Sequence, residues 1–545
     1  MSLMHIKIAL AQINVTVGDI SGNAEKIRRS VQKARNAGAD VVVFPELSIS
    51  GYPPQDLLLE DEFVDAGEKA LEETAKDVRG IIALAGYVRR VGKHRYNAVA
   101  VLGDGRVLGH ADKTNIPAYD VFDELRYFSP NPAPRPVTVD IKGQPCKLGI
   151  QICEDLWDDN YDVKVSRELA RQGADIILNA SASPYHTGKL RERLARVREK
   201  VRELKLPFVY VNLVGGQDEL IFDGGSFAVD AQGRLAACLP ASREALDYAE
   251  FVDGQAKRSV REPEMQEMEE LRSALVLGVR DYFYKSGFRD AVIGLSGGID
   301  SALVAALAAE ALGAEHVRSY AMPSRFSSGH SLEDAAELAE NLGIRHGVID
   351  IGALYDTFLK ALESPFAGTS FGIAEENLQA RIRGSILMSI ANKKNALVLT
   401  TGNKTEIAIG YCTLYGDMCG ALGPIADLNK LEVYRLAEHI NSARGKHIIP
   451  ERSLRKRPSA ELAENQYDPF DYGIVSPLVD ELLYRRKSIG RLIREYGDAG
   501  LVKKINNLIH RNEYKRWQAA PALRVTPKAF GRGRKMPMVN HFTYQ

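Results

Sequence analysis

Short runs of consecutive apolar residues, separated by helical patterns, restrict the fold of this chain more than any other feature. They include "DVVVFPEL" (40–47), "DIILNASA" (175–182), "AVIGL" (291–295) and "ALVLTTG" (396–402). Polar and apolar residues do not alternate in them, which is typical of strands covered on both faces. Helical patterns lie between the runs, such as "NAEKIRRSVQKARNAG", whose final Gly38 predicts a helix cap. The chain is therefore predicted to be an α/β protein.

The length of the chain, 545 residues, exceeds what one hydrophobic core supports. Between residues 253 and 273 the apolar pattern gives way to the charged stretch "DGQAKRSVREPEMQEMEELRS". We predict a boundary near residue 260, with one domain at 1–260 and another at 261–545. In the second domain strand-like and helix-like segments alternate. This alternation predicts a doubly wound parallel sheet that binds ligands at the carboxyl ends of its strands.

Composition excludes several classes of function. Lys plus Arg and Asp plus Glu number 71 each, so the charge balance does not favour nucleic acid as a partner. Five cysteines in so long a chain are too few for a disulfide framework and indicate a reducing compartment. We find no apolar run near the ~18 residues that span a bilayer, and no signal-peptide core at the N-terminus. The expectation is a cytoplasmic protein that binds no membrane.

Three residues at predicted strand ends form the first candidate site: Glu46 in "VVVFPEL", Lys113 in "HADKTNIP" and Cys153 in "LGIQICEDLW". Taken singly, they read as a surface carboxylate, a solvated lysine and a small core residue. Taken together, they fit nucleophilic catalysis. A thiol needs a base to become a thiolate, and attack on an amide needs a cation for the developing oxyanion.

These motifs, over residues 5 to 250, resemble the nitrilase superfamily of carbon–nitrogen hydrolases. The resemblance implies a four-layer αββα sandwich in which Glu46 is the general base, Lys113 stabilises the oxyanion and Cys153 forms a thioester. Glu124, in "FDELRYF", is a candidate second acid, and a salt bridge to Arg126 or another base is an equal alternative.

The segment "NASASPYHTGK" places Ser181, Ser183 and Lys189 after the next predicted strand, within reach of a small polar substrate. In the glutaminase branch of the superfamily, positions such as Tyr119, Ser183 and Lys189 bind glutamine. The segment 215–227, "GGQDELIFDGGSF", also resembles that branch, and its alternative is a plain turn between strands.

A second candidate site is the glycine turn "GLSGGIDS", residues 294–301, between a predicted strand and a predicted helix. Its backbone N–H groups and the helix N-terminus can bind an anion, although the turn lacks the lysine of a Walker A loop. Asp300 would repel a phosphate unless a cation lies between them, which favours Mg²⁺; the alternative is that Asp300 caps the helix. The turn resembles the loop of ATP-pyrophosphatases, which release pyrophosphate from ATP.

The segments "MPSRFSSGHSLEDA", "RPSAELAENQYDP" and the long stretch from Gly372 to Ala437 resemble NAD synthetase. With the first domain they match the family of glutamine-dependent NAD⁺ synthetases. The implied second fold is a Rossmann-like sheet of the adenine nucleotide alpha hydrolase type. The implied reaction amidates nicotinic acid adenine dinucleotide, here called deamido-NAD, while ATP becomes AMP and pyrophosphate. An alternative is another ATP-pyrophosphatase amidotransferase with a different nucleotide or carboxylate acceptor.

The resemblance also assigns residues by position. Asp300 and Glu406 would hold Mg²⁺. The ATP site would contain Gly294, Leu295, Ser296, Gly297, Gly298, Ile299, Asp300, Ser301, Thr401 and Lys430. The helix expected near Glu376 would bring residues to the deamido-NAD site, which would contain Asn377, Arg381, Glu406, Tyr411 and Lys515. A purely structural role remains the alternative for each residue, such as an ion pair of Glu406 with Lys404 or a neighbour. A protected route for ammonia and a homo-oligomer are further implications.

Overall fold

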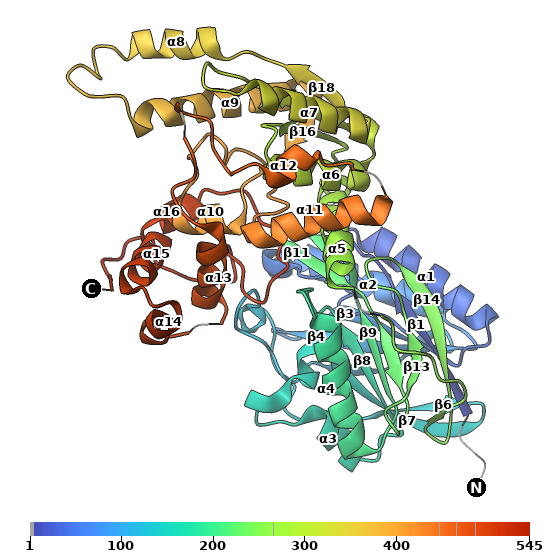
Figure 1. Cartoon of the computed structure of the whole chain (residues 1–545). Helices are drawn as coiled ribbons and strands as arrows, with labels where there is room; N and C mark the ends of the chain where they lie inside the picture. The colour runs from blue at the N-terminus through green and yellow to red at the C-terminus, as the bar shows by residue number, and fades with distance from the viewer. Residues whose placement is uncertain (1–4, 265, 446, 465, 486, 545) are drawn as a thin grey trace. The chain divides into compact units, whose positions relative to one another are not determined.

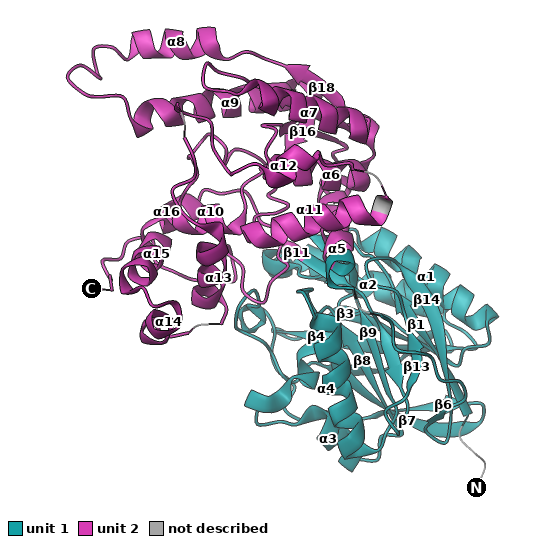
Figure 2. Ribbon diagram, viewed as in Figure 1, with its two compact units in different colours: residues 1–217, 221–270 teal, residues 218–220, 271–545 magenta. Residues whose placement is uncertain are grey.

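The computed structural model describes residues 5–264, 266–445, 447–464, 466–485 and 487–544. Residues 1–4, Met265 of the charged connector and Asn465 of the "RPSAELAENQYDP" segment lie outside the described residues. The chain forms two compact units (Figure 2). Unit 1 comprises Met1–Gln217 and Ile221–Glu270, and unit 2 comprises Asp218–Leu220 and Leu271–Gln545.

Unit 1 contains two mixed β-sheets. In each sheet the three central strands run parallel, β1-β2-β3 and β7-β8-β9, and antiparallel strands flank them. The first sheet has the order β15 (Gln255–Ala256), β14 (Ala245–Val252), β1 (His5–Gln12), β2 (Val41–Val43), β3 (Ile82–Val91), β4 (His94–Gly103) and β5 (Arg106–Asp112). The second has the order β13 (Leu235–Cys238), β12 (Phe227–Val229), β9 (Phe208–Asn212), β8 (Ile176–Ser181), β7 (Gln144–Ile152) and β6 (Val137–Ile141).

Helices cover the outer faces of the two sheets (Figure 1). Helices α1 (Ile20–Asn36) and α2 (Asp61–Asp77) pack on the first sheet, and α3 (Val165–Arg171) and α4 (Lys189–Leu204) pack on the second. Between the sheets lies one core to which both contribute, with Ile8, Val43, Ile150 and Val209 almost fully buried. The predicted αββα sandwich is therefore confirmed.

Capping residues explain where the first helix begins and ends. Helix α1 begins at Ile20, three residues before the quoted pattern, because the Asp19 carboxylate accepts the Gly22 N–H. It ends at Asn36, and Gly38 follows with φ +71°, so the predicted glycine stop lies just past the helix. The segment 215–227 forms the hairpin of β10 (Val214–Gln217) and β11 (Leu220–Asp223) and then enters β12.

Unit 2 is built on a parallel four-stranded sheet, as predicted. Its order is β18 (Arg345–Val348), β17 (Val317–Ala321), β16 (Asp290–Gly294) and β19 (Ala396–Val398). The chain passes from β16 through β17 to β18 and then crosses to β19 on the other side of β16. The switch point is therefore between β16 and β19, where parallel sheets of this kind bind ligands.

Helices make up most of the rest of unit 2. Helix α9 begins at Ile373, slightly before the expected start near Glu376, because the Glu375 carboxylate accepts the Gly372 N–H in the first turn. No helix in the described part of the chain is long and apolar enough to cross a membrane. The helices are α5 (Glu267–Lys285), α6 (Ile299–Leu312), α7 (Gly329–Leu342), α8 (Gly352–Ala361), α9 (Ile373–Lys394), α10 (Lys404–Ile409), α11 (Lys430–Arg444), α12 (Glu451–Arg455), α13 (Tyr472–Leu483), α14 (Ile489–Tyr496), α15 (Ala499–Arg511) and α16 (Glu513–Arg516).

Candidate active sites

Glu46 and Lys113 meet inside unit 1. Glu46 follows β2, and Lys113 follows β5, and both side chains are fully buried. The Lys113 Nζ donates to Glu46 Oε1 at 2.7 Å and to the two oxygens of Glu124 at 2.9 and 2.8 Å. Burial disfavours the ammonium, yet the charges of Glu124 and Glu46 raise the pKa of Lys113 well above its ordinary value. One buried cation therefore contacts two carboxylates and offsets only part of their charge.

Cys153 is the first residue after β7 and opens the short helix η3 (Cys153–Leu156). Its φ is +43°, in the left-handed region that residues other than glycine seldom adopt. Strained backbone of this kind is often retained at functional sites. Burial raises the pKa of the thiol, the Glu46 charge raises it further, and Lys113 opposes both. The resting thiol therefore keeps its proton, and a base must remove that proton before the sulfur can attack.

Glu124 contacts the same cluster. It accepts from Tyr52 Oη at 2.8 Å, and the Asn97 amide donates to Glu46 at 2.7 Å and to Glu124 at 3.3 Å. The base with which Glu124 pairs is thus Lys113. The sequence interpretation missed Tyr52 and Asn97. Asn97 directly precedes the apolar end of β4, and no motif marks either residue in the sequence.

Two of the residues predicted to bind glutamine contact the segment that follows Cys153. Tyr119 contacts Glu154, and Lys189 contacts Trp157. Lys189 Nζ lies 4.2 Å from the centroid of the Trp157 ring and 3.1 Å from Glu192 Oε2. Burial lowers the pKa of Lys189 below that of an ordinary lysine.

Glu154, beside the candidate nucleophile, is a further residue that sequence reasoning left without a role. Its carboxylate accepts from Tyr119 Oη at 3.0 Å and from Tyr161 Oη at 3.1 Å. Burial raises its pKa to about 7. Ser183 is buried, and its N–H donates to Asn212 Oδ1 at 2.8 Å, whereas the Ser181 hydroxyl bonds to Asn179.

Unit 2 contains a cavity of about 410 Å³ at the switch point of its sheet. That volume is typical of a small-molecule site. Most residues of the two predicted sites in unit 2 line it: Gly294, Leu295, Ser296, Gly298, Ile299, Asp300, Thr401, Lys430, Asn377, Glu406, Tyr411 and Lys515.

Three predicted residues are not among those that line the cavity. The Gly297 backbone packs against Ser331, where an added Cβ would lie 2.4 Å from the Ser331 carbonyl oxygen. With φ +72° in addition, glycine is required at this position. Ser301 is buried, and its hydroxyl donates to the Gly298 carbonyl at 3.0 Å. Arg381 is exposed, and its Nε donates to the Leu414 carbonyl at 3.3 Å.

Asp300, Glu406 and Lys430 form a charged cluster in the wall of the cavity. Lys430 Nζ contacts Asp300 Oδ2 and lies 3.5 Å from Glu406 Oε1. Burial raises the pKa of Glu406 to about 7, and Lys430 opposes that shift. The Asn403 amide donates to Asp300 Oδ1 at 2.9 Å, and the Asn403 side chain also caps α10.

Asp300 is therefore not the residue that caps α6, since Gly298 occupies that position. Glu406 pairs with Lys430, whereas Lys404 faces Asp427 and Asp480, each at 3.2 Å. Asn403 joins the cluster without having been predicted from the sequence.

The cluster suits a hydrated divalent cation better than a cage made of protein ligands alone. Among the described residues, no group of three or more His, Cys, Asp or Glu side chains is placed to hold a metal. Asp300 and Glu406 supply two carboxylates beside the N-terminus of α6. Mg²⁺ typically binds one or two carboxylates together with waters and phosphate oxygens, so the residues present fit Mg²⁺.

Comparisons with known proteins agree with both units. The carbon-nitrogen hydrolase family matches residues 7–257, and the NAD synthase family matches residues 271–519. A glutamine-dependent NAD(+) synthetase of Synechocystis is 44% identical, covering 98% of this chain and 99% of that protein. The Thermotoga maritima enzyme of that name is 39% identical, with 99% of each covered.

Solved structures agree as well. The glutamine-dependent NAD+ synthetase of Acinetobacter baumannii, determined with ADP, has a TM-score of 0.79 and 38% identity, and the match covers 98% of this chain and 99% of that one. Fold and sites together define a two-domain amidotransferase, a carbon–nitrogen hydrolase joined to an ATP-using synthetase. Given its full-length similarity to these relatives, the chain belongs to the family of glutamine-dependent NAD(+) synthetases.

Proposed function

We propose that this chain is an ATP-dependent ligase that amidates deamido-NAD to NAD⁺ with ammonia taken from glutamine. The observation that carries the proposal is the presence, in one chain, of both a buried Glu–Lys–Cys cluster and a cavity over a phosphate-binding turn. The relatives' names supply the substrates: glutamine as nitrogen donor and NAD⁺ as product.

The first half-reaction is hydrolysis of glutamine in unit 1. Glu46 takes the Cys153 proton as the sulfur attacks the side-chain amide carbon, and Lys113 stabilises the oxyanion that forms. The carbon–nitrogen bond breaks as Glu46 returns the proton to the leaving nitrogen, giving ammonia and a thioester on Cys153. Water, deprotonated by Glu46, then releases glutamate and restores the thiol. Tyr119, Ser183 and Lys189 hold the amino-acid end of glutamine.

The second half-reaction takes place in the cavity of unit 2. The carboxylate of deamido-NAD attacks the α-phosphorus of ATP and displaces pyrophosphate, so an acyl adenylate forms. Ammonia then attacks the acyl carbon and displaces AMP. The turn from Gly294 to Ser301 binds the phosphates through its N–H groups and the positive end of α6. Lys430 and Thr401 contact ATP, and Lys430 offsets the negative charge that builds up at the α-phosphorus.

The deamido-NAD site adjoins the ATP site in the same cavity. We assign to it Asn377, Glu406, Tyr411 and Lys515 from the cavity wall, with Arg381 as an outer contact. Lys515 is preordered, because its Nζ donates to the carbonyls of Gly410 and Cys412 at 2.8 and 2.7 Å. Tyr411 packs edge-on against Phe470, and this contact holds the Tyr411 ring at the cavity wall.

Mg²⁺ is the cofactor that we assign to Asp300 and Glu406. When bound, it would neutralise phosphate charge beside these carboxylates. Without a metal ion, two carboxylates and one ammonium leave the cluster net negative, which is unfavourable for binding a polyphosphate. The residues of the chain hold the carboxylates in place through Asn403 and Lys430.

We further propose that the protein acts as a homo-oligomer in the cytoplasm on small-molecule substrates, without nucleic-acid or membrane partners. Five free cysteines support a reducing compartment. Membership in the family supports the oligomer.

The proposed function is tested by incubating the purified protein with deamido-NAD, ATP, Mg²⁺ and glutamine. We expect NAD⁺, glutamate, AMP and pyrophosphate in equal amounts. ADP and phosphate in place of AMP and pyrophosphate would contradict the adenylation. Absence of NAD⁺, with turnover of another nucleotide carboxylate, would identify a different amidotransferase.

Replacement of the nucleophile separates the two half-reactions. We predict that Cys153→Ala abolishes NAD⁺ formation from glutamine and leaves formation from ammonium chloride within about twofold, because adenylation does not use the thiol. The matched variant Asp300→Asn is expected to lose NAD⁺ formation from both donors and to remain open to alkylation at Cys153 by a diazoketone analogue of glutamine. Glutamine-driven synthesis by Cys153→Ala would refute the assigned nucleophile.

A further inference from the structure

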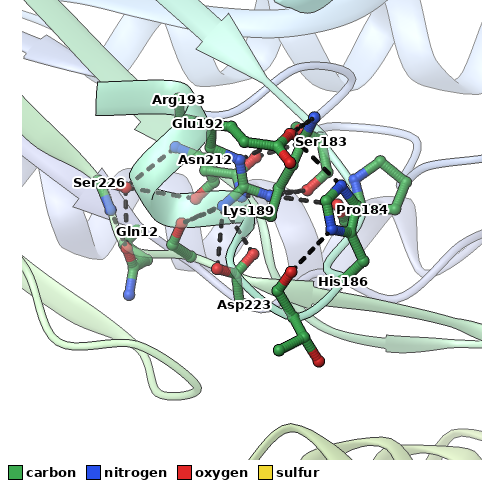
Figure 3. A network of polar contacts seen from close by, with 12 residues as sticks. Gln12, Ser183, Pro184, His186, Lys189, Glu192, Arg193, Asn212, Asp223 and Ser226 are labelled. Atoms are coloured by element: carbon green, nitrogen blue, oxygen red, sulfur yellow. Dashed lines mark hydrogen bonds and ion pairs between the residues drawn. The ribbon is translucent and has the colours of Figure 1, made fainter. Parts of the chain in front are cut away.

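A buried arginine beside the candidate glutamine site has no part in the mechanism described above. Arg193, in the second turn of α4, is 0% exposed. Its Nη1 donates to both oxygens of Asp223 at 2.8 and 2.9 Å, and Asp223 is also buried. Figure 3 shows the guanidinium between Asp223 and the Ser183–Pro184 segment. Burying such a pair is costly unless every donor finds a partner.

The other nitrogens of Arg193 hold one short segment of chain. Nη2 donates to the Ser183 carbonyl at 2.7 Å and to the Pro184 carbonyl at 3.3 Å, and Nε donates to the Ser183 hydroxyl at 3.3 Å. A lysine ammonium is a point charge and cannot reproduce this fork of donors in fixed directions. Arg193 therefore fixes both the backbone and the side chain of Ser183.

The same segment contacts the catalytic base. The Ala182 N–H donates to Glu46 Oε2 at 2.9 Å, on the oxygen that Lys113 does not occupy. Asn212 holds Ser183 from the other side, accepting its N–H at 2.8 Å and donating to its carbonyl at 3.3 Å. Residues 182–184 are thus clamped between Glu46 and the Arg193–Asp223 pair.

A second layer of contacts holds the segment that follows Asp223. Gln12 Oε1 accepts from the Ser226 N–H and hydroxyl at 2.9 and 2.8 Å, and the Ser226 hydroxyl accepts the Asn212 N–H at 3.0 Å. Gly224 between them has φ +66°, and an added Cβ would lie 2.3 Å from the Gln12 side chain. The clamp is therefore anchored in β1 and β9 as well as in α4 (Figure 3).

We propose that Arg193 is the positioning residue of the glutamine subsite: with Asp223 it sets the Ser183 hydroxyl for the substrate and the Ala182 N–H for Glu46. The inference rests on the proposed function, in which Ser183 binds glutamine and Glu46 is the base. Arg193 acts through these groups and does not touch the reacting atoms.

Two variants test the proposal in the full-length protein. Arg193→Lys keeps the charge and removes the fork, and Asp223→Asn keeps the shape and weakens the hold on the guanidinium. We expect both to lower kcat/KM for glutamine by about 10–100-fold, as small misplacements of reacting groups do. NAD⁺ formation from ammonium chloride is expected to stay within about twofold of wild type. Lys200→Gln is the matched control, because Lys200 is also buried on α4 but pairs with Asp158, 2.7 Å away.

A purely structural role predicts a different pattern. NAD⁺ formation from glutamine and from ammonium chloride would then fall together, with a lower Tm, or the control Lys200→Gln would lose glutamine use as severely. Either result overturns the proposal. So does an unchanged kcat/KM for glutamine in both variants. If Arg193→Lys does not fold, Asp223→Asn decides by the same criteria. A wild-type protein that uses ammonium chloride but not glutamine would instead contradict the proposed function itself.

Discussion

At the scale of single residues, the glutaminase site depends on where charge is buried. Lys113 is the one cation in contact with Glu46 and Glu124 among the described residues, and all three are shielded from water. A charge interaction is much stronger there than at the surface. Removing one partner of a buried pair therefore strongly destabilises the folded protein. The same low polarity keeps the Cys153 thiol protonated until Glu46 receives the proton. The cluster therefore avoids a free, easily oxidised thiolate in the resting enzyme.

Lys189 gives a prediction about pH at the same scale. Burial lowers its pKa below 10.5, so it loses its charge at lower pH than a solvated lysine. If it binds the carboxylate of glutamine, kcat/KM for glutamine falls as pH rises through that lowered pKa. Lys189→Arg keeps its charge to above roughly pH 12 and is expected to move this alkaline fall to higher pH. The check is a pH profile of kcat/KM from about pH 7 to 10.5 for both proteins.

The substrate's own amino group titrates in the same range, but it does so equally for both proteins. Only the difference between the two profiles therefore reports on Lys189. Superimposed profiles would show that Lys189 only contacts Trp157 and Glu192 and does not bind the substrate.

How far the sequence predicts these sites depends on how local each signal is. Glu46, Lys113 and Cys153 stand in short motifs at strand ends, so their grouping follows from the fold. Asn97 and Arg193 could not be found in this way. Each acts through contacts with segments remote in sequence: Asn97 with Glu46 and Glu124, and Arg193 with Asp223. A single chain gives no sign of such encounters.

At the scale of elements, one carboxylate joins the segments that carry the candidate oxyanion cation and nucleophile. Asp155 Oδ1 accepts the N–H groups of Thr114 and Asn115 at 3.1 and 2.8 Å, just after Lys113. Its other oxygen accepts the Ile152 N–H at 3.0 Å, just before Cys153. Asp155 is 2% exposed, so water does not replace these bonds. The turn after β5 and the start of η3 are thereby held together.

Asp155→Asn tests this connection. The new amide group must turn its NH₂ toward at least one of the three N–H groups, which leaves a buried donor unpaired at a cost of about 1–3 kcal/mol. We expect faster hydrogen exchange in peptides covering residues 113–116 and 150–157, with a loss of glutamine hydrolysis. The matched control is Asp140→Asn, because Asp140 accepts one exposed N–H, from Gly143 at 2.8 Å, where water can substitute. Equal effects of the two variants would exclude the proposed role of Asp155.

Elements themselves were predictable where hydrophobicity decides them. The quoted apolar runs became β2, β8, β16 and β19. Asp104–Gly105, a dipeptide typical of tight hairpin turns, connects β4 to β5 with positive φ at both residues. The helices α13 to α15 share one core, which includes Val475, Leu478, Val502 and Ile505. This core forms between helices, so the apolar face of a single helix does not indicate which helices it packs against.

At the scale of the whole molecule, the two half-reactions share one intermediate, ammonia, which solvent removes by protonation and dilution. Ammonia made at Cys153 is mostly protonated at neutral pH, and ammonium does not attack an acyl adenylate. A protein that released ammonia into solvent would therefore lose most of it before amidation. To convert most of the glutamine nitrogen into NAD⁺, the proposed reaction requires that ammonia reach the adenylate before it equilibrates with bulk water.

This requirement gives the last prediction. An excess of a scavenging enzyme that consumes free ammonia is added during turnover, such as a glutamate dehydrogenase that uses NADPH and a keto acid. Its oxidised product is NADP⁺, which is distinguishable from the NAD⁺ that is measured. NAD⁺ formation from ammonium chloride should be abolished, because that ammonia passes through solvent. Formation from glutamine should fall by less than about twofold, since a protected intermediate keeps its high effective concentration. The Asp223→Asn variant should behave as wild type in this respect, because it slows the supply of ammonia and not its transfer. If the scavenger suppressed both reactions equally, ammonia would have to cross open solvent, and the two active sites would be coupled only by their presence on one chain.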